Sequence, residues 1–309
     1  TVDHGAKGAA TVTATAGGLR ATASFAIPEA LTSITIKHEG KNTALSSLRV
    51  AGGSTTELTA TGWYYGNKVY SADTSFTWSV SDALGTIDED GTFTAVQTGR
   101  DVTGTLTVTC GETSCTLPVT VGSSQPFDDT KGHWAESCIT ELYYAGTLQG
   151  SEKNGKLYYR PDASMTRQEF IVAMMRYLGT DLSAYASVQL PFDDSGSIAS
   201  WAKSAMQAAY QLGYLTGSKT NGKLLAKPGS TISRQEAMTI LSRTKDFADA
   251  DPNVLSAFSD SGKIADWART ALAQMTQQKI ISGSKGKLNP TGKVTRAEVA
   301  KMLYMLSES

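Results

Sequence analysis

The sequence predicts a multidomain protein in which an all-β sandwich is followed by an all-α unit of three repeats around a pseudo-threefold axis. Two observations lead to these classes. The first 122 residues hold short runs of β-branched and aromatic residues between turn residues, whereas from residue 127 onward one pattern occurs three times with helical spacing. Residues 122–126, Gly-Ser-Ser-Gln-Pro, read as a linker. A length of 309 residues suits two or three domains.

The composition argues against several classes of function. Lys and Arg number 28 and Asp and Glu number 29, so bulk charge gives no reason to expect nucleic acid or an acidic membrane surface as partner. No apolar run approaches the roughly 18 residues of a spanning helix, so we expect no membrane insertion. The three cysteines and three histidines show no zinc spacing, and we expect neither a metal nor another cofactor.

The first part favours strands separated by Gly, Asp, Asn and Ser. Strands are expected at residues 34–37, 57–63, 75–80, 91–95, 103–110 and 115–121. Asp90-Gly91 predicts a tight turn. Because the strands are short and the turns frequent, a β-sandwich is the expected architecture.

Two segments of this part carry a family resemblance. Residues 76–82, Phe-Thr-Trp-Ser-Val-Ser-Asp, and residues 85–95 resemble the bacterial Ig-like group 2 family, over about residues 31–122. The resemblance implies an Ig-like sandwich for residues 31–122, with Trp78 as a buried core residue.

An internal repeat precedes this domain. Residues 11–19 resemble residues 105–113 without a gap, and Gly17 aligns with Gly111. The offset has the length of one Ig-like domain. We therefore expect residues 1–30 to be the C-terminal hairpin of a truncated preceding domain, and the chain to be a fragment.

Two cysteines stand close together near the end of the domain. Cys110 and Cys115 flank Gly-Glu-Thr-Ser, where the earlier copy holds Ala16 and Ala21. Two cysteines that occur together on facing strands predict a disulfide in an oxidising compartment. The alternative is a pair of half-buried thiols.

From residue 127 onward the repeats share four features in the same order, and two of the spacings between them are constant. Phe-Asp-Asp or Phe-Ser-Asp comes first, followed by Trp-Ala, then Gly-Ser, and finally Pro with Thr/Ser-Arg-x-Glu six residues later. Trp and Gly are 16 residues apart in every copy. The residues at these positions are Asp129, Asp194 and Asp260; Trp134, Trp201 and Trp267; Gly150, Gly217 and Gly283; Arg167, Arg234 and Arg296.

Each copy predicts two amphipathic helices. The first starts near the tryptophan, and the second follows a Thr/Ser-x-x-Glu capping box, as in Thr166 with Glu169. One helix pair cannot bury both faces alone. Three copies can close around a common axis, with the first helices as a central bundle.

The repeated arginine is the main candidate for binding. An arginine at a helix start is unfavourable by itself, because that end carries a partial positive charge. Its recurrence suggests an anion, such as a carboxylate, bound between the guanidinium and the helix start. The alternative is an ion pair with a nearby acid, such as Asp129, Asp194 or Asp260.

The other repeated residues have two interpretations each. The tryptophans either stack on a sugar ring or belong to the core. The aspartates either accept sugar hydroxyls or cap the first helix. The glycines serve backbone geometry, with close approach of a ligand as an additional gain. The capping glutamates are interpreted as structural.

The repeats resemble the S-layer homology (SLH) family over about residues 126–307. The chain departs from the family pattern in its Asn-Gly-Lys-Leu turns and in Arg-Gln-Glu for Arg-Ala-Glu. The resemblance divides this part at residues 123–186, 187–252 and 253–309. It implies a non-catalytic anchor at the bacterial cell surface. That anchor would bind a secondary cell-wall polymer, through a pyruvylated amino sugar, in grooves between repeats. Self-association in a surface layer stays open.

Two alternatives remain. The chain could be the tail of a larger secreted glycan-active enzyme, although it shows no catalytic arrangement of its own. It could also be an adhesin whose Ig-like domain binds glycan through Trp63, Tyr64, Tyr65 and Tyr70.

Overall fold

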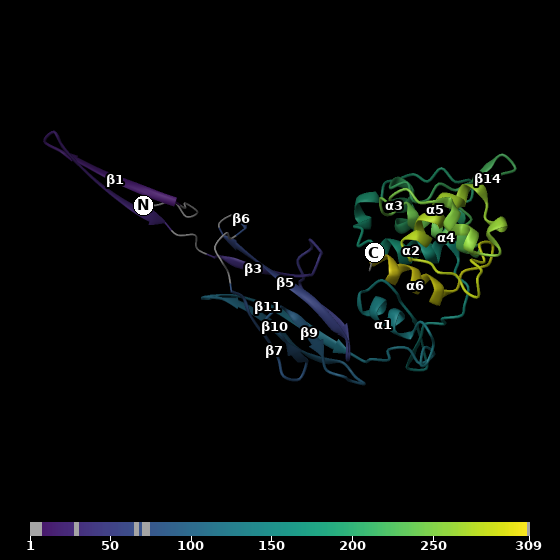
Figure 1. Ribbon diagram of the computed structural model, residues 1–309, viewed down its shortest axis with the longest axis horizontal. Helices are drawn as coiled ribbons and strands as arrows, with labels where there is room; N and C mark the ends of the chain where they lie inside the picture. The colour runs from purple at the N-terminus through teal and green to yellow at the C-terminus, as the bar shows by residue number, and fades with distance from the viewer. Residues whose placement is uncertain (1–7, 28–30, 65–67, 70–74, 308–309) are drawn as a thin grey trace. The chain divides into compact units, whose positions relative to one another are not determined.

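The computed structural model describes residues 8–27, 31–64, 68–69 and 75–307 (Figure 1). It divides into two compact units, residues 1–124 and residues 125–309. The first unit contains only strands among its described elements. These are β1 Gly8–Ala16, β2 Leu19–Ile27, β3 Ser33–His38, β4 Leu48–Ala51, β5 Thr55–Tyr64, β6 Lys68–Val69, β7 Thr77–Val80, β8 Gly85–Ile87, β9 Thr92–Ala95, β10 Val102–Cys110 and β11 Thr113–Gly122.

Residues 31–122 form a β-sandwich. One sheet has the strand order β4-β11-β10-β7, and the other has β3-β5-β9-β8 with β6 added to β5. Ile36 and Phe93 from the second sheet and Leu106 and Val108 from the first are buried in one core. Trp78, expected in this core, is half-buried, and its ring lies against Gly91.

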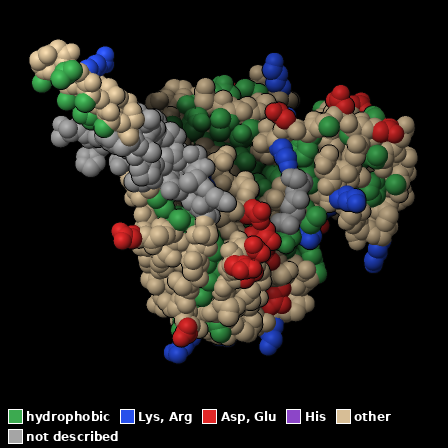
Figure 2. Space-filling view, turned by 60° about the vertical axis from the view of Figure 1, so that its left-hand side comes forward, with side chains coloured by type: hydrophobic (Ala, Val, Ile, Leu, Met, Phe, Trp, Pro, Cys, Tyr) green, Lys and Arg blue, Asp and Glu red, His purple; other side chains and the backbone are tan. Residues whose placement is uncertain are grey.

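The hairpin β1–β2 repeats the geometry of β10–β11. Gly8 pairs with Ile27 as Val102 pairs with Val121, which matches the sequence offset residue for residue. The side chains of residues 11–24 are all exposed, and hydrophobic ones show as green at the surface in Figure 2. The described part of this hairpin therefore buries no core of its own.

The disulfide predicted between Cys110 and Cys115 is not present. Both are free thiols, half-buried at the edge of the sandwich core. Cys110 lies opposite Thr113 and Cys115 opposite Val108, so the two cysteines are two residues out of register. The structure thus has the pair of half-buried thiols that the sequence analysis gave as the alternative.

The second unit contains helices, 3₁₀ turns and short hairpins. The helices are α1 Glu136–Tyr144, α2 Arg167–Tyr177, α3 Lys203–Gln211, α4 Arg234–Ser242, α5 Asp266–Gln277 and α6 Arg296–Ser307. The hairpin strands are β12 Ser151–Lys153, β13 Lys156–Tyr158, β14 Ser218–Thr220 and β15 Lys223–Leu225. The 3₁₀ turns are Leu182–Tyr185, Ser195–Ser197, Ser200–Ala202, Pro252–Ala257 and Ser261–Lys263.

The prediction of an all-α unit was wrong. Repeats one and two each insert a two-stranded hairpin between their helices, and repeat three has a single bridge there, Ser284 to Lys287. The cause is the Asn-Gly turn. Asn154 and Gly155 both have positive φ, of 55° and 73°, which is the conformation that closes a tight antiparallel hairpin.

The starts of the second helices meet in a closed ring of backbone hydrogen bonds. Met165 N–H donates to the Val294 carbonyl, Ile232 N–H to Met165 and Val294 N–H to Ile232, at 3.0–3.1 Å. Each of these residues comes just before α2, α4 or α6. The three repeats therefore join at this ring.

The capping boxes are confirmed in all three copies. In each copy the backbone N–H of the cap residue donates to the carboxylate of the glutamate three residues later, at 2.7–2.8 Å. The cap residues are Thr166, Ser233 and Thr295. The N–H groups of the next two residues donate to carbonyls of another repeat; Arg167 N–H, for example, donates to Ser230 at 2.9 Å. The start of each second helix is thus built partly from its neighbour.

The first helices pack against second helices of another repeat. α1 packs on α6, α3 on α2, and α5 on α4. Cys138 and Leu142 of α1 are buried as the helical spacing predicts. Trp134 precedes α1 and is exposed, outside this buried stripe.

A substitution at Gly150 tests how tightly the repeats are packed. An added Cβ there would come within 2.4 Å of the Phe127 ring and 2.7 Å of the Tyr158 carbonyl. We expect Gly150→Ala to lower the free energy of unfolding by about 1–3 kcal/mol, the usual cost of overpacking. Urea unfolding followed by tryptophan fluorescence measures it. Gly196→Ala is the control, because a Cβ there meets nothing within 4 Å. Equal midpoints for the two variants would contradict the packing.

Candidate functional site

The aspartates of the Phe-x-Asp motifs bind backbone within their own repeat. Asp129 accepts from the N–H groups of Tyr159 and Arg160 at 2.9 and 2.8 Å. Asp194 does the same for Ala226 and Lys227 at 2.8 and 2.7 Å. Asp260 accepts in the same way from the N–H groups of Leu288 and Asn289. These carboxylates fix the segment after the hairpin, an arrangement that neither sequence interpretation had considered.

The repeated glycines allow the hairpin to approach the motif phenylalanine. A Cβ on Gly217 would lie 2.6 Å from Phe192, and one on Gly283 would lie 2.8 Å from Phe258. Gly217 and Gly283 also have positive φ, of 73° and 67°. Backbone geometry and close packing together therefore account for glycine at these positions.

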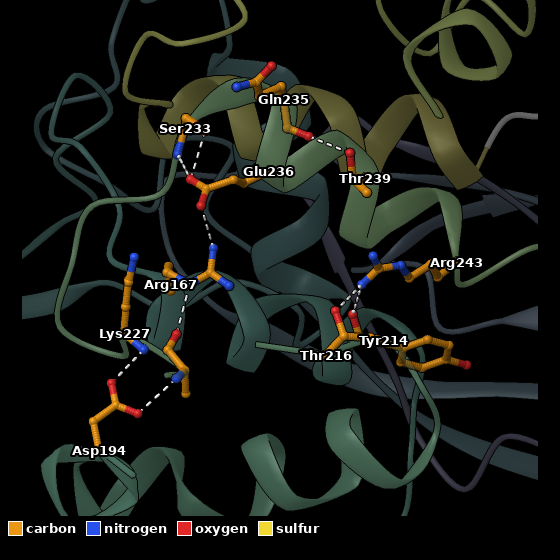
Figure 3. Close-up of polar contacts among 11 residues, drawn as sticks. Arg167, Asp194, Tyr214, Thr216, Lys227, Ser233, Gln235, Glu236, Thr239 and Arg243 are labelled. Carbon is orange, nitrogen blue, oxygen red and sulfur yellow. Dashed lines mark hydrogen bonds and ion pairs between the residues drawn. The ribbon is translucent and has the colours of Figure 1, made fainter. Parts of the chain in front are cut away.

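Each repeated arginine reaches into the next repeat, and Figure 3 shows this for Arg167. Arg167 is buried; its Nε donates to the Ala226 carbonyl at 2.9 Å, and its Nη1 pairs with Glu236 at 2.9 Å. Arg234 donates to the Leu288 carbonyl at 2.8 Å and pairs with Glu298 at 2.7 Å. The ion-pair alternative thus holds for these two, but the partner is the next repeat's capping glutamate.

Burial lowers the pKa of the Arg167 guanidinium, and the charges of Glu236 and Asp194 act in the opposite direction. The helix start beside it offers no free N–H, because the first N–H groups of α2 already donate to Ser230 and Pro228. An anion at this place would therefore meet the guanidinium and not the helix end. The role of the three arginines in binding stays a prediction.

The three tryptophans are exposed at the surface. Trp134, Trp201 and Trp267 are 62%, 58% and 59% exposed. Large aromatic rings seldom lie this open in a folded unit. The core interpretation of these residues therefore does not hold, and a ring is available to a ligand in each repeat.

Two cavities lie where residues from all three repeats come together. We call groove A the cavity of about 320 Å³ lined by Arg167, residues 214–218, Glu236, Thr239 and Ile240 of α4, Arg243 directly after α4, and Trp267. We call groove B the cavity of about 1020 Å³ lined by Arg234, residues 279–285, the α6 residues Glu298 to Met305, and Trp134. Each groove combines an arginine, a glycine loop and a tryptophan from three different repeats.

Each groove takes up three of the twelve predicted residues, and the other six line neither groove. Groove A brings together Arg167, Gly217 and Trp267, and groove B brings together Arg234, Gly283 and Trp134. The three aspartates line neither groove. Arg296 of the remaining set donates to the carbonyls of Tyr159 and Gln149 and lies 4.5 Å above the Tyr159 ring.

Sequence reasoning missed Arg243, which lines groove A. Its Nη1 donates to the Tyr214 carbonyl at 2.8 Å, as Figure 3 shows. Burial lowers its pKa, the charge of Arg167 lowers it further, and both arginines line the same groove. Groove A thus carries two guanidinium groups and one carboxylate. A recurrent arginine nine residues after Arg167 and Arg234 was the available signal.

Among the described residues, no group of three or more His, Cys, Asp and Glu side chains could hold a metal ion. None of the described helices has the length and apolarity that a membrane crossing requires.

The repeats match a known family. Residues 126–171, 191–238 and 257–300 match the S-layer homology domain. They are three tandem S-layer homology domains. Such domains bind cell-wall polymers, so this part of the chain is an anchoring module of the bacterial cell surface.

Similar proteins include enzymes and a surface-layer protein. Amylopullulanase of Thermoanaerobacterium thermosulfurigenes is 31% identical over 59% of this chain and 9% of that protein. Exoglucanase XynX of Acetivibrio thermocellus is 29% identical over 60% and 16%. The surface-layer 125 kDa protein of Lysinibacillus sphaericus is 30% identical over 41% and 10%. The chain spans less than a fifth of the length of these relatives.

Among solved structures, surface layer protein SbsC, domains 4–9, aligns with a TM-score of 0.24 and 14% identity. The alignment covers 40% of this chain and 19% of that one.

Asp260 makes the SLH unit sensitive to acid. Burial would raise the pKa of its carboxyl, but the N–H groups of Leu288 and Asn289 outweigh burial and hold the pKa below its usual value. A depressed pKa adds stability that is complete above the unfolded value of about 3.9 and is lost as the pH falls through the folded value.

We therefore expect Asp260→Asn to cost about 1 kcal/mol of unfolding free energy at pH 7, and the difference from wild type to shrink as the pH falls below the unfolded value of about 3.9. Urea unfolding at several pH values measures it. Asp266→Asn is the control, because that side chain is fully exposed. A pH-independent difference would show that the charge of Asp260 is not what matters.

Proposed function

We propose that this chain anchors a secreted protein to the bacterial cell wall by binding a secondary cell-wall polymer in grooves A and B. The observation that carries the proposal is the pairing, in each groove, of an exposed tryptophan with cationic side chains. An open indole suits the apolar face of a sugar ring. A guanidinium suits a carboxylate on that sugar.

The sugar that best fits both groups is a pyruvylated amino sugar, as the family resemblance implies. It carries one carboxylate on a ring, and groove A offers Arg167 and Arg243 beside Trp267. Arg167 is partly engaged by Glu236, so Arg243 would supply much of the attraction.

The rest of the chain has a supporting role in this proposal. Residues 31–122 would serve as an Ig-like spacer, and the hairpin β1–β2 repeats the last hairpin of that domain. The boundaries at residues 123–186, 187–252 and 253–309 mark the three SLH repeats. We infer that the chain is non-catalytic and, like the tail of a longer protein, serves whatever domains it is joined to.

The adhesin alternative receives no specific support. Trp63 Nε1 donates to Thr35 at 2.8 Å, and the Lys37 ammonium lies 5.8 Å from the centre of the Trp63 ring. The N–H and one face of this indole therefore already have partners within the protein. Tyr65 and Tyr70 lie outside the described residues, and the side chain of Tyr64 is not described.

Removing the groove tryptophans tests the site without disturbing the core. We expect Trp134→Ala/Trp267→Ala to weaken binding to purified sacculi by at least about tenfold per tryptophan, roughly 1.4 kcal/mol each. Leu212→Ala is the control, because it is also exposed and lines neither groove. Co-sedimentation of the full chain with sacculi measures binding. Unchanged binding by the double variant would remove the grooves from the proposal.

A second test isolates the carboxylate. In a Trp134→Ala background, Arg243→Met copies the residue that repeat three holds at that position. We expect this variant to bind native sacculi about tenfold more weakly, because it loses one charge-assisted hydrogen bond to the carboxylate. We expect it to bind sacculi stripped of pyruvyl groups as well as its Trp134→Ala parent does. An equal loss on both kinds of sacculi would contradict recognition of the pyruvyl carboxylate.

A further inference from the structure

Grooves A and B differ most in their lysines. Groove B is lined by four of them, and its carboxylate, Glu298, is paired with Arg234 at 2.7 Å. Groove A has no lysine among its lining residues. The lysines are Lys279, Lys285, Lys287 and Lys301.

A short turn brings two of these lysines to the groove. Gly217 and Pro228 are 11 residues apart, whereas Gly283 and Pro290 are 7 apart. In repeat two the longer loop forms the β14–β15 hairpin, which projects away from the helices in Figure 1. In repeat three the turn closes at once, so Lys285 and Lys287 line the groove.

Lys287 lacks the acidic partner that the equivalent lysine of repeat one has. In repeat one the equivalent Lys156 pairs with Asp128 at 2.9 Å. Repeat three holds Ser259 in place of Asp128, and its hydroxyl donates to the Gly286 carbonyl. Within the described residues, no ion pair joins the four lysines of groove B to an acid.

Two of the lysines occupy backbone positions that disfavour them. Lys279 has a φ of 59° where repeat two has Gly213, and Lys285 has a φ of 49° where repeat two has Asn221. A side chain at such a φ costs roughly 1 kcal/mol relative to glycine. The fold therefore gains nothing from lysine at 279, and its ammonium group is what distinguishes the position.

We propose that groove B contains a second anion-binding position, formed by these four lysines, and so binds two or more neighbouring anionic groups of one linear polymer. Groove A, at about 320 Å³ against about 1020 Å³, takes a single charged sugar. That the natural ligand is a cell-wall polymer rests on the proposed function. That groove B binds a linear polyanion does not. Ammonium groups are point charges that accept either a phosphodiester or a carboxylate.

The test uses the full chain and two pairs of probes. Linear polyphosphate and oligogalacturonate carry repeated anions as phosphates and carboxylates; inorganic phosphate and galacturonate carry the same groups singly. We expect the repeated anions to bind at least about tenfold more tightly than the single ones, since two exposed ion pairs add up to about that factor. The preferred polymer identifies the anion class, and calorimetry measures the affinity.

Lys279→Gly/Lys301→Thr puts the residues of repeat two into groove B. We expect it to lose about tenfold in affinity for the preferred polymer and to flatten the fall in affinity with salt, because screening acts on the missing charges. The matched control is Lys219→Thr/Lys223→Thr, which removes the same charge from the projecting hairpin and leaves the affinity unchanged. Equal losses in both variants would overturn the proposal.

A labelling experiment gives a result that does not depend on folding of a variant. In the wild-type chain, bound polymer protects Lys279 and Lys301 from an amine-acylating reagent while Lys219 stays reactive; uniform labelling would overturn the proposal. Failure of the wild type to bind sacculi, with polymer binding and protection intact, would reject only the anchoring function.

Discussion

The SLH unit depends on one constraint: each second helix begins on the backbone of another repeat. Met165, Ile232 and Val294 close a three-membered ring of N–H to carbonyl bonds just before those helices. The next N–H groups donate to the following repeat, and the arginine side chain reaches the same neighbour. A helix start leaves several N–H groups without partners, and here the neighbouring repeat supplies them. No repeat satisfies its own backbone alone.

This constraint also decides where a ligand can bind. Because the repeats interlock through helix starts, the exposed tryptophan of one repeat, the glycine loop of another and the arginine of a third come together. Arg167 and Arg234 serve two purposes at once, since each holds a junction and lines a groove. Their substitution would therefore disturb stability together with binding, which is why Arg243 and the tryptophans report on the site more cleanly.

Small differences between copies act on the grooves and leave the junctions intact. Repeat three keeps the ring, the capping box and the Asp260 contacts, yet its loop is shorter and its turn carries lysines. The scaffold tolerates this because the loop lies outside the buried contacts. On the proposed function, nonequivalent grooves on one scaffold would let a single chain contact different parts of one polymer.

The sequence alone determined the number of repeats, the capping boxes, the strand-rich first part and the family. These depend on local patterns, such as Thr166 with Glu169, that act within one turn of chain. The hairpin at Asn154-Gly155 was also readable, although the all-α prediction overlooked it. Only the tertiary structure decided that Asp129 binds backbone, that Arg167 pairs with Glu236, and that Trp134 lies open in a groove with Arg234. Those contacts join residues about 30 to 100 positions apart, and no local periodicity encodes which repeat a side chain will meet.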